Sequence, residues 1–175
     1  MNAQAGRNRG RVLRRIAEQA GIIFFFRSDC PYCHIEAPVL KTLERVYGFT
    51  IYPVSLDGQA LHNGLFRDFR ADQGQAEAMG VIRVPAVYLV RPPNGIAPIG
   101  QGALALDQLK QRIVLAAVNA GWISEREYTE TRPLASDQLM ASGPLGTGAK
   151  LPEDPAKLVA YLRSQVAGRG TDVRR

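Results

Sequence analysis

The sequence predicts an α/β fold in which helices flank a central mixed sheet, and three observations support that prediction. Residues 22–26 form a continuous apolar run, which is typical of a strand buried on both faces of a sheet. A helical pattern follows directly, and a second strand and a second helix come after it. Two apolar segments joined by a turn at residues 91–95 then predict an antiparallel hairpin, so the sheet combines parallel and antiparallel strands.

Apolar spacing predicts the elements in order. We expect a helix over residues 11–20, strands over 22–26 and 49–56, a short helix over 75–79, strands over 86–90 and 96–101, and a helix over 105–120. The helix after the first strand begins with Pro31, because proline is favoured at the first helical position, where its missing N–H is not needed. This places Cys30 at or beside the N-cap of that helix.

Length and composition suit one domain with an appendage, since the chain has 175 residues and is 46% hydrophobic. We expect a basic N-terminal tail at residues 1–10, a domain over 11–122 with an insertion at about 58–74, and a partly disordered C-terminal extension over 123–175. Within that extension, residues 141–155 are rich in glycine and proline and are interpreted as a linker, and residues 155–166 are compatible with a short helix.

The formal net charge is +6, and much of the surplus lies at the two ends of the chain. No aromatic residues interleave these arginines, so we expect solvated ends and no nucleic-acid partner. No stretch approaches the ~20 apolar residues of a membrane span, and residues 22–26 are too short for the core of a signal peptide. The sequence as given therefore predicts no export signal, which leaves open a cytosolic protein or a chain without its leader.

The two cysteines, Cys30 and Cys33, are separated by only two residues. A bridge between them closes a very small loop and constrains little, so the pair is better explained as a reactive site than as a structural crosslink. Cys30 at the helix start can accept the free N–H groups of Tyr32 and Cys33, and the positive end of the helix favours its thiolate. Cys33, one turn into the helix, is suited to resolving a mixed disulfide. Arg27 should stabilise the Cys30 thiolate and Asp29 should oppose it.

Two other interpretations of this segment are a haem attachment site and a zinc site. His34 follows Cys33 and completes the pattern of c-type haem attachment, but no haem fold explains the rest of the chain. A zinc site would need two cysteines and two histidines, and His62 falls in an irregular segment. We therefore expect no metal and no cofactor, and we interpret His34 as a polar residue of the first turn that influences Cys30.

Pro85 lies between two apolar segments, where proline is disfavoured inside a central strand. One explanation is a cis Val84–Pro85 peptide that bends the chain next to the cysteines. The other is an ordinary trans proline at the start of a strand. The position of the proline alone favours the second explanation.

Taken together, these motifs resemble the thioredoxin superfamily over about residues 15–120. The pattern is an apolar strand, Cys30-Pro31-Tyr32-Cys33, then Ala37-Pro38-x-Leu40, Gly80-Val81-x-x-Val84-Pro85-Ala86, and Gly102-Ala103-Leu104 before the last helix. Within the superfamily, the segments FFFRSDCPYC, VSLDG, DQGQAEAMGVIRVPAVYLV and ISEREYTETRPL resemble the conjugal-transfer pilus-assembly proteins of the TraF/TrbB type.

The resemblance implies a thioredoxin fold and a periplasmic protein disulfide oxidoreductase or isomerase of a bacterial conjugation (type IV secretion) system. It implies that Cys30 is the nucleophile, that Cys33 resolves, and that Pro85 is a cis-proline that aligns the backbone of the substrate. Pro31, Tyr32 and Val84 would contact that substrate. The implied partners are cysteine-containing client proteins, among them components of the conjugation apparatus.

The sequence departs from thioredoxin at two places. Thioredoxins carry a buried acid six residues before the first cysteine, and here that position is Phe24. Proton transfer to Cys33 must then use water or another group, for which Glu36 is a candidate. The Pro31-Tyr32 pair is that of glutaredoxins, although no glutathione-site pattern accompanies it.

Two alternative functions stay open on the sequence. One is a cytosolic glutaredoxin-like reductase, and the other is a non-catalytic pilus-assembly factor that binds partners through residues 58–74 and the C-terminal tail. The 58–74 segment mixes charges with four large apolar residues, Leu61, Leu65, Phe66 and Phe69. These residues either form part of a client-binding face or build a local core that caps the domain.

Overall fold

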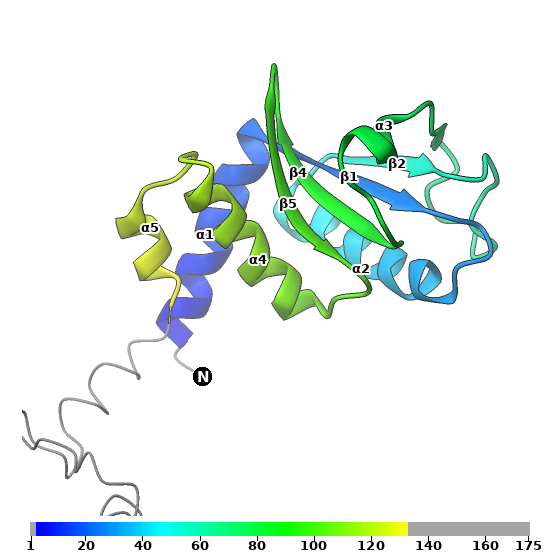
Figure 1. Cartoon of the computed structure of the whole chain (residues 1–175). Coiled ribbons are helices and arrows are strands. Elements are labelled where there is room, and N and C mark those ends of the chain that lie inside the picture. Colours follow the sequence, from blue (N-terminus) through cyan, green and yellow to red (C-terminus); the bar gives the residue numbers. More distant parts are fainter. Residues whose placement is uncertain (1–2, 133–175) are drawn as a thin grey trace, which may run out of the picture. The chain divides into compact units, whose positions relative to one another are not determined.

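The computed structural model describes residues 3–132, which form a five-stranded sheet with helices on both faces (Figure 1). In chain order the elements are α1 (Ala3–Gln19), β1 (Gly21–Phe26), α2 (Pro31–Tyr47), β2 (Ile51–Ser55), β3 (Arg70–Ala71), α3 (Gln75–Ala78), β4 (Ala86–Arg91), β5 (Gly95–Gln101), α4 (Leu106–Asn119) and α5 (Glu125–Glu130). The linker expected at 141–155 and the helix expected at 155–166 lie outside the described residues.

The strand order is β3-β2-β1-β4-β5. Helix α2 connects the parallel pair β1 and β2, whereas β4 runs antiparallel to β1 and forms a hairpin with β5. This strand order and these connections are those of the thioredoxin fold, and the predicted mixed sheet is confirmed. β3 was not predicted, because it consists of two exposed residues that pair with the end of β2.

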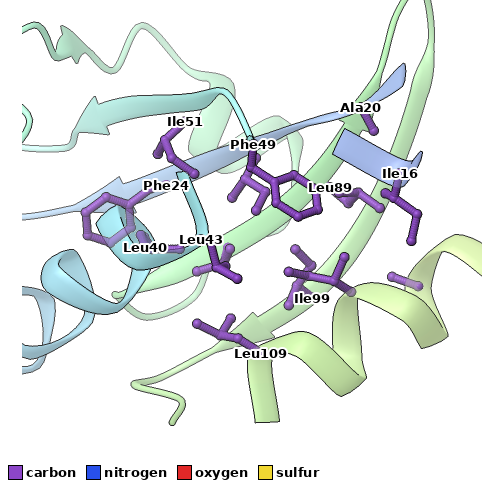
Figure 2. Packing of buried hydrophobic residues seen from close by; sticks show 14 of the residues in the cluster. Ile16, Ala20, Phe24, Leu40, Leu43, Phe49, Ile51, Leu89, Ile99 and Leu109 are labelled. Carbon is purple, nitrogen blue, oxygen red and sulfur yellow. The ribbon is translucent and has the colours of Figure 1, made fainter. Parts of the chain in front are cut away.

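Strand β1 is the centre of the core because both of its faces are covered. Ile22, Phe24 and Phe26 are fully buried on the face covered by α1, α2 and α4, and Figure 2 shows Phe24 among the leucines of α2. Phe25 points to the other face, where it packs with Ala76 of α3 and with the ring of Tyr88. The two-residue period of a strand explains why an unbroken apolar run is needed here.

The N-terminal tail predicted for residues 1–10 is wrong over the described part, because α1 already begins at Ala3. Ala5 is buried, Asn8 donates to the backbone oxygen of Glu130 over 3.1 Å, and Arg9 donates to that of Thr131 over the same distance. Contacts with a segment more than a hundred residues away thus extend a helix whose own sequence contains two glycines and little apolar periodicity.

The first ten residues of the expected C-terminal extension pack on the domain. Ser124 is the N-cap of α5: its side chain accepts from the Glu127 N–H while the Glu127 carboxylate accepts from Ser124. Glu127 pairs with Arg15 of α1, and Glu130 lies 3.4 Å from Arg11. Among residues 3–132, no helix combines the length and the apolar character that a membrane crossing requires.

The apolar residues of the 58–74 segment pack inward. Leu61 and Phe66 are buried in the main core, where the Phe66 ring lies 5.6 Å from that of Phe24. Phe69 is partly buried with its ring 5.8 Å from Phe26, and Leu65 also packs against this core. This packing favours a local core over a client-binding face as the explanation of these four side chains.

Candidate active site

Cys30 occupies the N-cap of α2, as the position of Pro31 predicts. Its backbone is extended, with φ −92° and ψ 108°, and its Sγ accepts a hydrogen bond from the Cys33 N–H over 3.1 Å. The first N–H groups of a helix have no partner within the helix, so a sulfur at this position receives one of them and also the positive end of the helix dipole. Both effects stabilise a thiolate on Cys30.

Cys30 and Cys33 are joined by a disulfide bond, with their Cα atoms 5.3 Å apart. Their environments differ. The Cys33 side chain is fully buried, whereas Cys30 is half-buried and Pro31 and Tyr32 between them are exposed. An incoming sulfur nucleophile can therefore reach Cys30 more readily than Cys33.

The Val84–Pro85 peptide is cis, which confirms the first of the two explanations of this proline. The Val84 carbonyl oxygen lies 3.8 Å from the Cys30 Sγ, and Pro85 itself is buried. Because Cys30 carries no proton in the disulfide, this is a contact and not a hydrogen bond. β4 follows this peptide and lies beside β1, and this pairing brings the loop to the start of α2.

Arg27 and Asp29 precede the cysteines and neutralise each other. The Arg27 Nε and Nη2 donate to the two oxygens of Asp29 over 3.0 and 3.2 Å. The hydrogen bond from Arg27 holds the pKa of Asp29 below its usual value. The sequence predicts that Arg27 stabilises the Cys30 thiolate and that Asp29 opposes it. The two side chains instead form one exposed ion pair, so they do not act on Cys30 as independent charges.

The loop before Cys30 is anchored by Asp57, to which the sequence analysis assigns no role. Asp57 Oδ2 accepts from the Ser28 N–H over 2.9 Å and from the Ser28 hydroxyl over 2.7 Å. Its Oδ1 accepts from the Ser55 hydroxyl over 2.8 Å and from the Gln59 N–H over 3.2 Å. Desolvation raises the pKa of Asp57, but these hydrogen bonds outweigh it and lower that pKa to about 2.

Glu36 is a buried acid one helical turn after Cys33. Its Oε2 accepts from the Leu104 N–H over 2.8 Å, and its Oε1 is buried without a hydrogen-bond partner in residues 3–132. Burial raises the pKa of Glu36 to about 7, against the opposing effect of the Leu104 hydrogen bond. Phe24, at the position of the missing thioredoxin acid, is fully buried in the core.

His34 holds the same loop from the helix side. Its Nε2 lies 2.9 Å from the Ser28 carbonyl oxygen, and its ring centroid is 5.4 Å from that of His62. The two cysteine sulfurs that haem attachment requires are bonded to each other. In the part of the chain that the structure describes, no three histidine, cysteine or acidic side chains gather as metal ligands.

Exposed large apolar side chains occur at the start of α2 and in the loop before the cis peptide. Tyr32 is 63% exposed and Ile35 is 60% exposed, both near the start of α2. Ile82 is 87% exposed and lies two residues before Val84. Exposed apolar groups beside a reactive disulfide suit contact with an apolar protein segment.

Comparison with known proteins places the chain in a family. A sequence profile described as "TraF: F plasmid transfer operon protein" matches residues 1–114. The chain belongs to the TraF family. It is similar to "Protein TraF" of Escherichia coli (strain K12), with 36% identity over 104 residues that make up 59% of this chain and 41% of that protein.

The chain is also similar to "Protein TrbB" of the same organism, with 47% identity over 38 residues, or 22% of this chain and 21% of TrbB. The chain thus spans less than half the length of both curated relatives. Among solved structures, MTB dsbF "in its mixed oxidized and reduced forms" is similar with 21% identity and a TM-score of 0.45, covering 59% of this chain and 84% of that one. The fold of this TraF-family chain is assigned from its strand order and connections.

Proposed function

We propose that this TraF-family chain is a protein thiol–disulfide oxidoreductase or isomerase that acts on proteins of a bacterial conjugative transfer system. The observation that carries the proposal is the placement of the Cys30–Cys33 disulfide. Its accessible sulfur caps α2 and lies against the cis Val84–Pro85 peptide, while its second sulfur is buried.

The proposed reaction transfers the disulfide to a client dithiol. A client thiolate attacks the Cys30 Sγ, the client–Cys30 bond forms, and Cys33 leaves as a thiolate. The second client thiolate then attacks the client sulfur, which forms the client disulfide and releases Cys30 as a thiolate. The client loses two electrons and the cysteine pair gains them. In reverse, the same steps reduce a client disulfide. If a different client cysteine attacks the client sulfur of the mixed disulfide, Cys30 is released and the client disulfide is isomerised.

Glu36 is the proposed proton donor and acceptor for Cys33. A Cys33 thiolate is costly in its fully buried position, because burial disfavours the charged form. Glu36 lies three residues further on the same helix face, and its pKa near 7 keeps a large share of it protonated at neutral pH. It can therefore protonate the leaving Cys33 sulfur and recover the proton when Cys33 attacks.

The client is proposed to lie across the start of α2. Pro31, Tyr32 and Val84 are the proposed contacts, with Pro85 aligning the client backbone. The exposed rings and aliphatic chains of Tyr32, Ile35 and Ile82 favour an apolar, extended protein segment over a small thiol. No observation on residues 3–132 favours glutathione as the substrate.

The conjugation context rests on the family. The matched profile is named for the F plasmid transfer operon, and both relatives are Escherichia coli proteins called TraF and TrbB. We infer from these names a role in pilus assembly or type IV secretion, with clients among the transfer proteins and the periplasm as the compartment.

The decisive experiment measures the reduction potential of the Cys30–Cys33 pair and its activity on protein substrates. The wild type should reduce insulin or reactivate scrambled ribonuclease, and Cys30→Ser should abolish both activities. Cys33→Ser should trap mixed disulfides with clients. A reduction potential of about −120 mV indicates an oxidase, and one of about −270 mV indicates a reductase. A wild-type protein that transfers no disulfide to any protein substrate would contradict the proposal and leave a non-catalytic assembly role.

A further inference from the structure

The loop that presents Val84 to Cys30 is held on α3 at its start, where the Gly80 and Val81 N–H groups donate to the carbonyl oxygens of Glu77 and Ala76 over 3.1 and 2.9 Å. Residues 79–85 connect α3 to β4, outside any helix or strand, and Ile82 and Arg83 within it are exposed. Beyond Val81, the chain needs support from another element if the cis Val84–Pro85 peptide is to keep its place beside the disulfide.

That support comes from Gln101, the last residue of β5. Its Oε1 accepts from the Ile82 N–H over 2.9 Å and from the Arg83 N–H over 3.1 Å. Its Nε2 donates to the Gly80 carbonyl oxygen over 3.0 Å and to the Tyr88 hydroxyl oxygen over 3.3 Å. The amide thus makes four hydrogen bonds, two as acceptor and two as donor, and three of the four partners lie on the 79–85 loop.

Neighbouring contacts support this arrangement. The Tyr88 hydroxyl donates onward to the Met79 carbonyl oxygen over 2.9 Å, and Tyr88 itself is buried. The backbone of Gln101 pairs with Ala86 in the sheet, and the Gly102 N–H donates to the Pro85 carbonyl oxygen over 2.7 Å. The end of β5 therefore holds the loop on both sides of the cis peptide.

We propose that Gln101 is a positioning residue that holds the 79–85 loop ready for client binding. It touches neither cysteine and acts through the loop, by fixing the backbone of Ile82 and Arg83 ahead of Val84. The inference rests on the proposed function, because a preformed loop matters only if a protein segment docks on it. A loop that is already ordered loses less conformational freedom when a client binds, so removal of the clamp should weaken client binding more than the sulfur chemistry.

The test compares a protein client with a small disulfide. Gln101→Ala should raise the KM for insulin reduction about tenfold, since several hydrogen bonds of ordinary strength are lost. Its kcat and its rate with the small reagent 5,5′-dithiobis(2-nitrobenzoate) should stay within about twofold of wild type. Gln19→Ala is the matched control, because Gln19 also bonds a backbone oxygen, that of Trp122, but lies at the end of α1. An unchanged KM, or an equal loss with insulin and with the small reagent, overturns the inference.

Amide hydrogen exchange tests the clamp without any client. In the wild type the Ile82 and Arg83 amides should exchange slowly despite their exposed positions, and Gln101→Ala should speed both. Gln101→Glu keeps the acceptor but loses the donors to Gly80 and Tyr88, so it should loosen the loop in part, and it serves if the alanine variant does not fold. Wild-type amides that exchange at the rate of an unstructured peptide overturn the inference, whereas a wild type without insulin reductase activity overturns only the proposed function.

Discussion

The Glu36 carboxylate accepts a hydrogen bond from the Leu104 N–H across 2.8 Å, while its other oxygen is buried without a partner in residues 3–132. Leu104 belongs to the segment that connects β5 to α4, so this bond ties α2 to the chain that follows the edge strand of the sheet. Because burial disfavours the charged form, a carboxyl group in this place is stable chiefly in its neutral form.

The first prediction is that Glu36 makes the folded, oxidised protein less stable as the pH rises. The pKa of Glu36 is raised from 4.5 to about 7, so its favourable contribution is complete below pH 4.5 and is lost as the pH rises through about 7. The loss amounts to at most about 3–4 kcal/mol. Between pH 5 and pH 8 the wild type should therefore lose stability that Glu36→Gln keeps. Urea unfolding of both proteins at the two pH values measures this difference.

The control for this prediction is Glu44→Gln. Glu44 lies on the same helix, is half-exposed and pairs with Lys41 over 2.7 Å. It should shift stability equally at both pH values. A Glu36→Gln variant that follows the wild-type pH profile would mean that Glu36 is ionised in the folded protein at neutral pH, and its role as proton donor would be lost.

The second prediction concerns the two thiols after reduction. Cys30 should react with iodoacetamide at neutral pH and Cys33 should not, because Cys30 caps α2 and is half-buried whereas Cys33 is fully buried. Peptide mass mapping after brief alkylation identifies the modified residue. Preferential modification of Cys33 contradicts the assignment of Cys30 as nucleophile.

The third prediction is that Asp57 supports the loop before Cys30 through its charge. The lowered pKa of Asp57 contributes stability that is present above pH 3.8 and is lost as the pH falls toward about 2. Asp57→Asn should cost about 1–2 kcal/mol at pH 6, because the amide cannot accept all of the bonds from Ser28, Ser55 and Gln59. Between pH 6 and pH 3 the free energy of unfolding should fall less in Asp57→Asn than in the wild type, which urea unfolding at the two pH values measures. A variant that matches the wild-type profile would show that the Asp57 charge plays no part.

The sequence predicts the elements whose signals are local. Pro31 after an apolar run places Cys30 at a helix start, and the resemblance to thioredoxins identifies Pro85. The sequence does not predict the first turns of α1 or the Gln101 clamp, because their partners lie far along the chain. Asn8 and Arg9 bond the backbone at residues 130 and 131, and Gln101 bonds a loop about twenty residues earlier. Only the folded chain brings these groups together.

The last prediction separates core residues from client contacts by paired substitutions. Phe66 is 4% exposed and packs on Phe24, so Phe66→Ala should destabilise the protein by about 3 kcal/mol, as removal of a buried ring does. Ile82 is 87% exposed, so Ile82→Ala should leave stability unchanged.

The effect on activity should be the opposite: Ile82→Ala should impair insulin reduction and Phe66→Ala should not. At a temperature where both are folded, Phe66→Ala should reduce insulin with the wild-type KM, because its ring faces the core and not the client. Ile82→Ala should raise that KM several-fold while its rate with the small disulfide reagent stays that of wild type, because the lost side chain contacts only a protein substrate. If Phe66→Ala impairs insulin reduction while folded and Ile82→Ala does not, the client lies over the 58–74 segment and not over the loop that Gln101 holds.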